Sequence, residues 1–225
     1  MKEITHRVEL LPGFTHTDPV LQVEGVARTC YQSEPKNGNH RASEDFIRRL
    51  IRNGHTAMIE FASVGFRIVT DRGVTHELVR HRLCAFGQES SRYVKYDGEM
   101  EFIRPVWCPE AILGTWREED EWWRGHNGNI LRVADGDFCG ACWEAEQAYK
   151  FLLDQGWPPE QAREVLPNAL KTEIVVTANY REWRHIFKLR ALGTTGRPHP
   201  QMKALMLPVL EDFRAMLPVM FEDLK

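Results

Sequence analysis

The densest group of potential ligand-binding side chains lies in one stretch, ELVRHRLCAFGQESSRY, at residues 77–93. Arg80, His81 and Arg82 are consecutive there, and Arg92 follows near its end. Guanidinium groups stay charged at any working pH and bind phosphate or carboxylate through two parallel hydrogen bonds. Three consecutive side chains cannot share one face of a regular helix or strand, so they can hold a ligand that crosses the backbone, or two ligands on opposite sides. The alternative is a solvated helix face with salt bridges.

Composition limits what such a site can bind. The chain has 225 residues, enough for one large domain or two small ones, and 43% of them are apolar. Its formal net charge is −3 and its pI is about 6.3. Proteins that bind nucleic-acid polymers normally carry a basic excess, so no such partner is expected. A small phosphorylated molecule needs only a local cationic pocket and is allowed.

Nothing in the sequence is typical of export or membrane insertion. The N-terminal stretch MKEITHRVELLPGF lacks the apolar segment of a signal peptide, and no uninterrupted apolar run approaches about 18 residues. We therefore expect no membrane partner and a cytoplasmic location. A reducing compartment also agrees with the odd number of cysteines and their lack of a disulfide-like framework. They are Cys30, Cys84, Cys108, Cys139 and Cys142.

The spacing around the arginines carries a family resemblance. Arg80, His81 and Arg82 are followed by seven residues and then by Ser90. With this pattern the chain resembles the flavin-dependent thymidylate synthases (the ThyX family). The resemblance covers most of residues 20–104 and 141–215. The companion segments, in chain order, are residues 53–82, AREVLP at 162–167, TANYREWRHIFKLR at 177–190 and HPQM at 199–202.

The resemblance implies an α+β fold with a central, mainly antiparallel sheet flanked by helices. It also implies a homotetramer whose active sites lie between subunits. The implied reaction is a methyl transfer, the reductive methylation of dUMP to dTMP. In it 5,10-methylenetetrahydrofolate donates the carbon, FAD carries the hydride and NADPH is the reductant. The chain has no GxGxxG fingerprint, which agrees with a family that does not bind flavin on a Rossmann fold.

The resemblance also implies which residues bind dUMP. Arg92 and Arg163 would bind its 5′-phosphate, and Arg190 would lie at the uracil edge. A fixed positive charge there stabilises negative charge developing at N3 and O2 and raises electron density at C5, so Arg190 is the expected catalytic residue. Its structural alternative is a cation near a helix C-terminus. The full dUMP set is Glu77, Leu78, Val79, Arg80, Gln88, Glu89, Ser90, Ser91, Arg92, Arg163 and Arg190.

A second set is implied for FAD. Arg181 and His185 are four residues apart, so on a helix they share one face and can contact one ligand together. His55 and His199 match histidines near the flavin, although a histidine taken alone is more often a hydrogen-bonded structural residue. The full FAD set is His55, Ala57, Arg80, His81, Arg82, Leu83, Gln88, Asn179, Tyr180, Arg181, His185 and His199.

Several other residues have side chains that could react, but a non-reactive role is favoured for each. Ser90 could be a nucleophile, but no base stands at a fixed spacing from it, so hydrogen bonding to the nucleotide is the favoured role. Cys84 occupies a small-residue position of the motif, which favours a packed, unreactive thiol. Cys139 and Cys142 form a CxxC, which can be a redox pair or half of a zinc site. No second pair completes a metal site, so a buried structural pair is favoured and no metal is expected.

The chain departs from the common family pattern near the flavin. Gly87-Gln88 stands where many members have Asn-Glu, and Gln88 keeps the hydrogen-bonding capacity without the charge. Phe61 stands where a histidine is common, and Ala57 where a hydroxyl can contact FAD. The loop at residues 192–198 is longer than in compact members. These differences affect individual flavin contacts.

Two other functions remain open from the sequence. One is a sister enzyme of the same fold that places a different one-carbon group on a pyrimidine nucleotide. The other is a non-catalytic nucleotide- or RNA-binding protein that uses its arginines and aromatic residues. Bound flavin would separate the enzymes from the binding protein, and analysis of the product would separate the two enzymes.

Several elements must position these segments. Alternation predicts an edge strand at residues 4–10 and a half-buried strand at 61–70, followed by a turn at 71–73, and β-branched residues predict a strand at 173–179. Helical spacing predicts helices at 19–31, 43–54, 74–82, 141–156, 158–166, from 180 onward, and from the loop at 191–200 to about 221.

Cap residues and one irregular segment complete the predicted organisation. Ser43 is expected to cap the second helix and Gly54 to end it in a left-handed turn. Asn179 with Glu182 three residues later has the pattern of a capping box. Residues 106–138 are rich in Trp, Gly, Asp and Glu without a clear period. We interpret them as an insertion or long connection within a single catalytic domain at residues 1–225.

Overall fold

The computed structural model describes residues 1–10, 18–34, 39–117, 119–122 and 124–225. They form two compact units, each built from three parts of the chain. None of the described helices is long and apolar enough to cross a bilayer. Unit 1 comprises Met1–Arg7, Ile68–Leu78 and Gly87–Ile174, and unit 2 comprises Val8–Arg67, Val79–Phe86 and Val175–Lys225.

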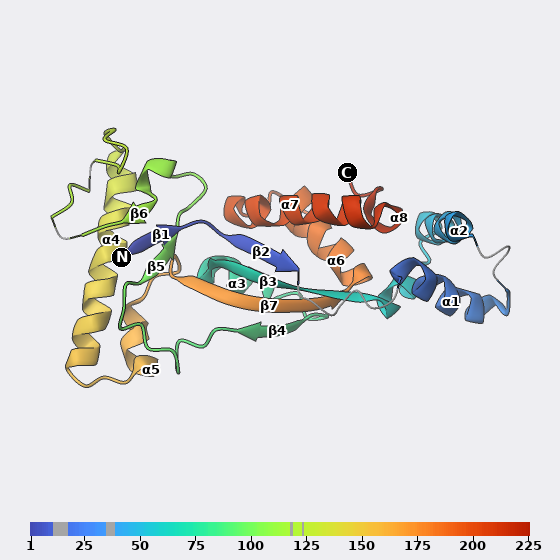
Figure 1. Ribbon diagram of the computed structural model, residues 1–225, viewed down its shortest axis with the longest axis horizontal. Helices are drawn as coiled ribbons and strands as arrows, with labels where there is room; N and C mark the ends of the chain where they lie inside the picture. Colours follow the sequence, from blue (N-terminus) through green and yellow to red (C-terminus); the bar gives the residue numbers. More distant parts are fainter. Residues whose placement is uncertain (11–17, 35–38, 118, 123) are drawn as a thin grey trace. The chain divides into compact units, whose positions relative to one another are not determined.

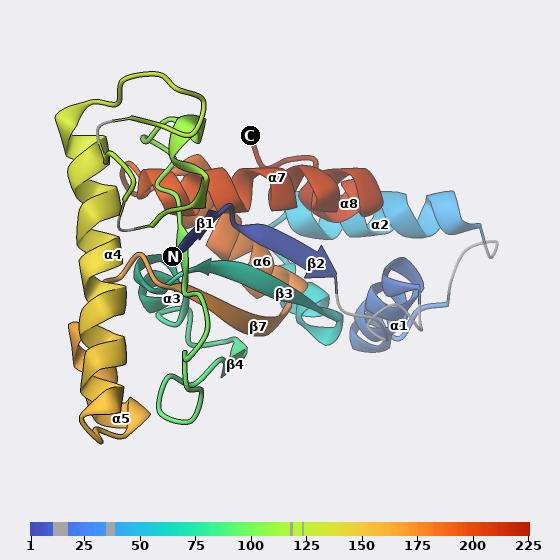
Figure 2. The same ribbon diagram turned by 60° about the vertical axis from the view of Figure 1, so that its left-hand side comes forward.

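Unit 1 combines a small sheet with one long helix. Strand β1 (Lys2–Ile4) pairs in parallel with β5 (Glu101–Ile103) and antiparallel with β6 (Gly114–Thr115), with Glu3 opposite Phe102. Figure 2 shows the long α4 of this unit and the short α5 that follows it in the chain. The helical elements of unit 1 are α3 (Arg72–Leu78), η2 (Glu110–Ile112), α4 (Val133–Asp154), α5 (Pro159–Ala162) and η3 (Arg163–Val165).

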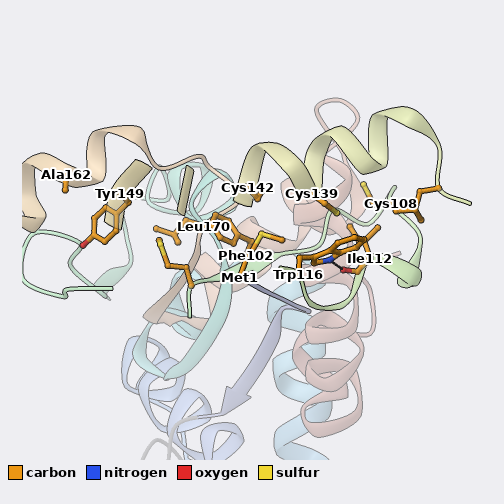
Figure 3. Packing of buried hydrophobic residues seen from close by; sticks show 12 residues of the cluster. Met1, Phe102, Cys108, Ile112, Trp116, Cys139, Cys142, Tyr149, Ala162 and Leu170 are labelled. Atoms are coloured by element: carbon orange, nitrogen blue, oxygen red, sulfur yellow. Dashed lines mark hydrogen bonds between the residues drawn. The ribbon is translucent and has the colours of Figure 1, made fainter. Parts of the chain in front are cut away.

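The tryptophan-rich segment contributes to the core of unit 1. Trp116 is 2% exposed, and its ring stacks on that of Trp122 at a centroid distance of 5.3 Å. Figure 3 shows Cys139 and Cys142 on the side of α4 that faces Phe102. Burial raises the pKa of both thiols, so they are unreactive and agree with the favoured structural pair.

Unit 2 is mainly helical. The pair α1 and α2 pack against each other, and α7 and α8 pack against each other (Figure 1). Its aromatic core includes Trp183, Phe187, Phe213 and Phe221, with the last two ring centroids 4.6 Å apart. The elements are α1 (Pro19–Tyr31), α2 (His40–Arg52), η1 (Thr56–Phe61), α6 (Tyr180–Phe187), the π-helical η4 (Lys188–Leu192), α7 (Pro200–Met216) and α8 (Pro218–Phe221).

Four strands form a second sheet, and each has residues in both units. Their order is β2-β3-β7-β4. The α+β class is therefore confirmed, whereas the homotetramer and the single catalytic domain stay predictions. The strands are β2 (Arg7–Leu10), β3 (Ser63–Asp71), β4 (Ala85–Gln88) and β7 (Lys171–Asn179).

Several local predictions are confirmed. The first helix spans Pro19–Tyr31 as predicted. Burial alternates along β7, as its sequence pattern predicted. Gly54 follows α2 with a φ of 77°, in the left-handed region that favours glycine. Asn179 caps α6, because its side chain accepts the N–H of Glu182 at 2.8 Å.

Other local predictions are wrong. The helix α2 begins at His40 with Asn39 as its cap, and Ser43 is buried inside the helix, where its hydroxyl donates to Glu24. No separate turn follows β3, because Asp71 accepts the N–H of Val74 at 2.7 Å and α3 begins at once.

Four predicted elements have different bounds. The predicted edge strand is divided into β1 and β2, and α4 begins at Val133, inside the segment interpreted as a connection. The helix predicted at residues 158–166 is instead α5 followed by η3. The fourth difference affects the site, because α3 ends at Leu78 and leaves the Arg-His-Arg triplet outside the helix.

Candidate active site

Residues expected to bind the phosphate of dUMP meet within unit 1. Arg163 donates from Nη1 to Oγ of Ser91 at 3.1 Å, although the two are 72 residues apart. Arg92 pairs with Glu160 of α5 at 3.2 Å, and its guanidinium lies 5.4 Å from the ring centroid of Tyr93. The structure thus brings two predicted segments of the dUMP set together. It adds Glu160, whose only sequence signal was its position three residues before Arg163.

The Gln88 side chain is held in one orientation. Its Nε2 donates to the hydroxyls of Thr75 and Thr172, at 3.0 and 3.3 Å, and both threonines are fully buried. The Thr75 hydroxyl itself donates to the carbonyl of Arg72, so it can accept from Gln88. The amide therefore lies with its nitrogen toward the interior of unit 1. Neither threonine was selected from the sequence, because both depend on tertiary proximity.

Glu89 is fixed by several contacts in the same unit. Its N–H donates to the carbonyl of Glu173 at 2.9 Å, and its carboxylate accepts from the Tyr96 hydroxyl at 2.5 Å. Lys171 lies 3.5 Å from the same carboxylate. Burial and this hydrogen bond raise the pKa of Tyr96, which keeps it a donor. Glu89 thus anchors the segment that contains Ser90 and Ser91.

The remaining dUMP candidates have simpler surroundings. Leu78 is fully buried at the end of α3, whereas Val79 is 39% exposed. The Ser90 hydroxyl accepts the N–H of Arg92 at 3.4 Å, and the Ser90 carbonyl accepts the N–H groups of the residues three and four positions later. Ser90 therefore shapes a turn, and its hydrogen bond to the nucleotide stays a prediction. Glu77 is half-buried on α3.

A different set of predicted residues meets within unit 2. Arg190 donates from Nε to Nε2 of His81 at 3.1 Å, across 109 residues of sequence. Nδ1 of His81 lies 3.5 Å from Oε1 of Glu182, and the rings of His81 and His185 lie edge to face at 5.7 Å. Because Nε2 accepts a hydrogen bond from a guanidinium that never loses its proton, the neutral ring carries its proton on Nδ1.

The electrostatics of this group keep His81 uncharged. Burial lowers the pKa of His81 to about 4, and the charges of Arg190 and His185 act in the same direction. The pKa of Glu182 is raised, because the effect of burial exceeds the opposing effect of the His185 charge. The pKa of Cys84 is raised to about 12, mainly by burial and to a smaller extent by the charge of Glu182. A thiol with so high a pKa agrees with the unreactive role that was expected.

His81, Glu182 and His185 could also be read as a metal site. One potential ligand atom from each lies within 4.8 Å of the others, a geometry found only here among the described parts of the chain. A metal ligand must offer a lone pair. Nε2 of His81 already accepts from Arg190, Nδ1 holds the proton, and a guanidinium lies alongside. This arrangement disfavours a cation.

A hollow of about 370 Å³ opens beside this group in unit 2. Leu83, which is 75% exposed to solvent, supplies an apolar surface to this hollow. Arg181 and His185 supply polar groups from one face of α6. Arg181 also forms an ion pair with Glu60, a residue that was not selected from the sequence. An apolar face with convergent polar groups fits part of a planar heteroaromatic ligand such as a flavin ring. The lining residues are Glu60, Leu83, Asn179, Arg181, Glu182 and His185.

The other flavin candidates of unit 2 divide by exposure. His55 accepts or donates a hydrogen bond with the Tyr31 hydroxyl through Nδ1 at 3.0 Å. Tyr180 is 5% exposed and packs edge to face against Phe213 and Phe221, and burial raises its pKa to about 12, so its ring is part of the core. The exposed candidates are His55, Ala57, Arg80, Arg82 and His199.

Comparison with known proteins agrees with these motifs. The family model described as "Thymidylate synthase complementing protein" matches residues 14–219. A flavin-dependent thymidylate synthase from Geobacter sulfurreducens is 34% identical over 215 residues, covering 92% of this chain and 83% of that protein. One from Mycobacterium bovis BCG is 34% identical over 218 residues, covering 95% and 83%.

Solved structures show the same fold. The UMP/dUMP methylase PolB from Streptomyces cacaoi, bound with 5-Br dUMP, is similar with a TM-score of 0.75 and 22% identity, covering 99% of this chain and 96% of that one. The same methylase bound with 5-Br UMP gives a TM-score of 0.73. The family model over residues 14–219 and the relatives at 34% identity show that the chain belongs to the thymidylate synthase complementing protein family.

Proposed function

We propose that the protein is a flavin-dependent thymidylate synthase, which methylates dUMP reductively to dTMP. Relatives that are 34% identical over most of the chain carry that name. The observation that carries the proposal is the contact between Arg163 and Ser91, because it joins two separate segments of the predicted nucleotide site. A similar fold has been solved with 5-Br dUMP bound.

Phosphate binding is assigned to unit 1. The guanidiniums of Arg92 and Arg163 suit a dianionic phosphate, and the Ser91 hydroxyl can add a hydrogen bond. Glu160 now accepts from Arg92, so the phosphate would take over that interaction or share it. Gln88, held by two threonines, would add neutral hydrogen bonding close to the same segment.

Activation of the uracil ring is assigned to Arg190. Its positive charge would stabilise negative charge on the N3–O2 side of the ring and so favour attack from C5. Its Nε donates to His81, and its terminal nitrogens would donate to the uracil. The π-helical turn Lys188–Leu192 places this residue after α6.

The cofactors follow from the same assignment. The exposed Leu83 face and the polar groups of Arg181 and His185 would hold and orient FAD. When bound, FAD supplies the hydride, and NADPH and 5,10-methylenetetrahydrofolate serve as reductant and carbon donor. We further propose a homotetramer with active sites between subunits. Light scattering should then give about four times the chain mass of 26.1 kDa.

A coupled product assay tests the proposal. Purified protein should show flavin absorbance that is released on denaturation, and with dUMP, methylenetetrahydrofolate and NADPH it should form dTMP, identified by mass spectrometry. A product with a different one-carbon group would favour the sister enzyme. Colourless protein that also fails to take up added FAD would favour a nucleotide-binding protein without catalysis. The same assay with UMP separates activity on the two nucleotides.

A further inference from the structure

Glu182 occupies an unusual place for a carboxylate at the start of a helix. It is the third residue of α6, where an acidic side chain normally faces solvent or returns to the cap residue. Here Glu182 is 6% exposed, and its Oε1 lies 3.5 Å from Nδ1 of His81. Asn179 still caps the helix, because its side chain accepts the Glu182 N–H. The Glu182 carboxylate, however, faces His81.

The contacts of His81 indicate a role for this carboxylate. Arg190 donates to Nε2 of His81, a bond that exists only while the neutral ring has its proton on Nδ1, and Nδ1 faces Glu182. A carboxyl oxygen at that position favours the Nδ1–H tautomer whether Glu182 is ionised or neutral, since both forms offer an acceptor. Without it, the neutral ring could protonate Nε2 and would then present a donor to the donor of Arg190.

We infer that Glu182 is a positioning residue, which fixes the tautomer and orientation of His81 so that His81 holds the Arg190 guanidinium. The inference rests on the proposed role of Arg190 in the thymidylate synthase reaction. It assigns Glu182 a function that does not require contact with substrate or cofactor. A carboxylate or carbonyl that orients a histidine is a common way of setting which ring nitrogen is used.

The first test observes the ring itself, without added nucleotide. Nitrogen-15 NMR of the full-length protein, with labelled histidine and the His81 signals assigned by their loss in His81→Asn, should show Nδ1 protonated and Nε2 accepting. Glu182→Ala should give a mixture of the two neutral tautomers. Glu182→Gln should keep the original tautomer, because its amide oxygen can still accept from Nδ1–H.

The second test separates positioning from binding. We expect Glu182→Ala to lower kcat for dTMP formation by about 10- to 100-fold with little change in KM for dUMP, because a misplaced catalytic group mainly raises the barrier. Glu182→Gln should recover most of kcat. Glu211→Ala is the matched control: its carboxylate pairs with Arg214 on α7 and is 57% exposed, so kcat should be unchanged.

The outcomes are distinguishable. If Glu182→Ala keeps both the Nδ1–H tautomer and the parent kcat, the inference is overturned while the proposed function stands. A loss of kcat that merely follows a loss of folded protein in circular dichroism would also overturn it, as would a Glu182→Gln variant as impaired as Glu182→Ala. If the parent protein makes no dTMP but its His81 tautomer depends on Glu182, the positioning contact stands and the proposed function fails.

Discussion

Arg163 and Ser91 are joined by a hydrogen bond of 3.1 Å between Nη1 and Oγ. The serine follows β4, and the arginine begins η3, which comes directly after α5. Arg163 also lies 3.8 Å from Glu164, so it is held from two sides while its side chain stays 35% exposed. This combination of fixed position and access suits a group that receives a phosphate.

Replacing Arg163 should weaken nucleotide binding. A hydrogen bond from a charged donor contributes about 1.5 to 3 kcal/mol, so Arg163→Ala should raise the Kd for dUMP by roughly 10- to 100-fold. Isothermal titration calorimetry measures this directly. The control is Arg124→Ala, which removes an arginine of the same unit that pairs with Glu121. Normal dUMP affinity in Arg163→Ala would remove the residue from the phosphate site.

Replacing Arg190 should separate chemistry from flavin binding. Arg190→Ala should retain oxidised flavin but lose about 100- to 1,000-fold in the release of tritium from C5-labelled dUMP, the cost typical of a lost electrostatic stabiliser. Arg190→Lys keeps the charge but cannot reproduce the fork or the Nε bond to His81, so an intermediate rate is expected. Unchanged tritium release in Arg190→Ala would exclude a catalytic role.

The cap of α6 contributes to stability independently of any ligand. Asn179 accepts the Glu182 N–H at 2.8 Å, so Asn179→Ala should lower the free energy of unfolding by about 1 kcal/mol in urea denaturation of the flavin-free protein. Asn179→Ser provides another oxygen acceptor and should restore most of it. If Asn179 also contacts FAD, the serine variant should recover stability without recovering flavin affinity. Equal stability of the alanine and parent proteins would contradict the capping contribution.

Local sequence patterns predicted the elements that depend on local interactions. Alternation along β7 and the Asn179 cap both follow from neighbouring residues and agree with the structure. The prediction that Ser43 caps α2 was wrong because an equally good cap residue, Asn39, stands four residues earlier. The Ser43 hydroxyl instead donates to Glu24 of α1. The start of α4 was missed because the residues before Ala141 include two glycines and show no clear helical period.

The candidate site was predictable as a set of residues but not as a set of contacts. The family resemblance selected His81 and Arg190. Their direct hydrogen bond could not be foreseen, because it joins residues 109 apart in the chain. Glu182 was noted only as part of a cap, and Glu160 was not selected at all. Both become relevant through tertiary neighbours, a buried histidine for Glu182 and an arginine for Glu160.

A buried acid in unit 1 gives a pH-dependent prediction. Glu3 is 3% exposed on β1, and neither carboxyl oxygen has a hydrogen-bond partner among the residues that the structure describes. Burial raises its pKa from 4.5 to about 8, although the N-terminal amine and Arg104 act in the opposite direction. The carboxyl is therefore protonated in the folded protein at neutral pH but ionised in the unfolded chain.

The sign of the effect follows from this difference. Between about pH 4.5 and 8 the folded state binds the extra proton, so the Glu3 contribution to stability falls as pH rises through this window, and it levels off above the folded pKa. Glu3→Gln is neutral at every pH and removes this dependence. Urea denaturation at pH 5 and pH 8 should show Glu3→Gln gaining roughly 3 to 5 kcal/mol relative to the parent protein at the higher pH.

An exposed glutamate supplies the comparison for Glu3. Glu144 lies on the exposed side of α4 in the same unit, so Glu144→Gln should follow the parent protein at both pH values. The difference between the two variants isolates the cost of ionising a carboxyl group inside the β5-β1-β6 sheet. If Glu3→Gln and Glu144→Gln show the same pH dependence, the Glu3 carboxyl ionises without penalty in the folded protein. Its pKa would then lie near the ordinary value for glutamate, and burial on β1 would not govern it.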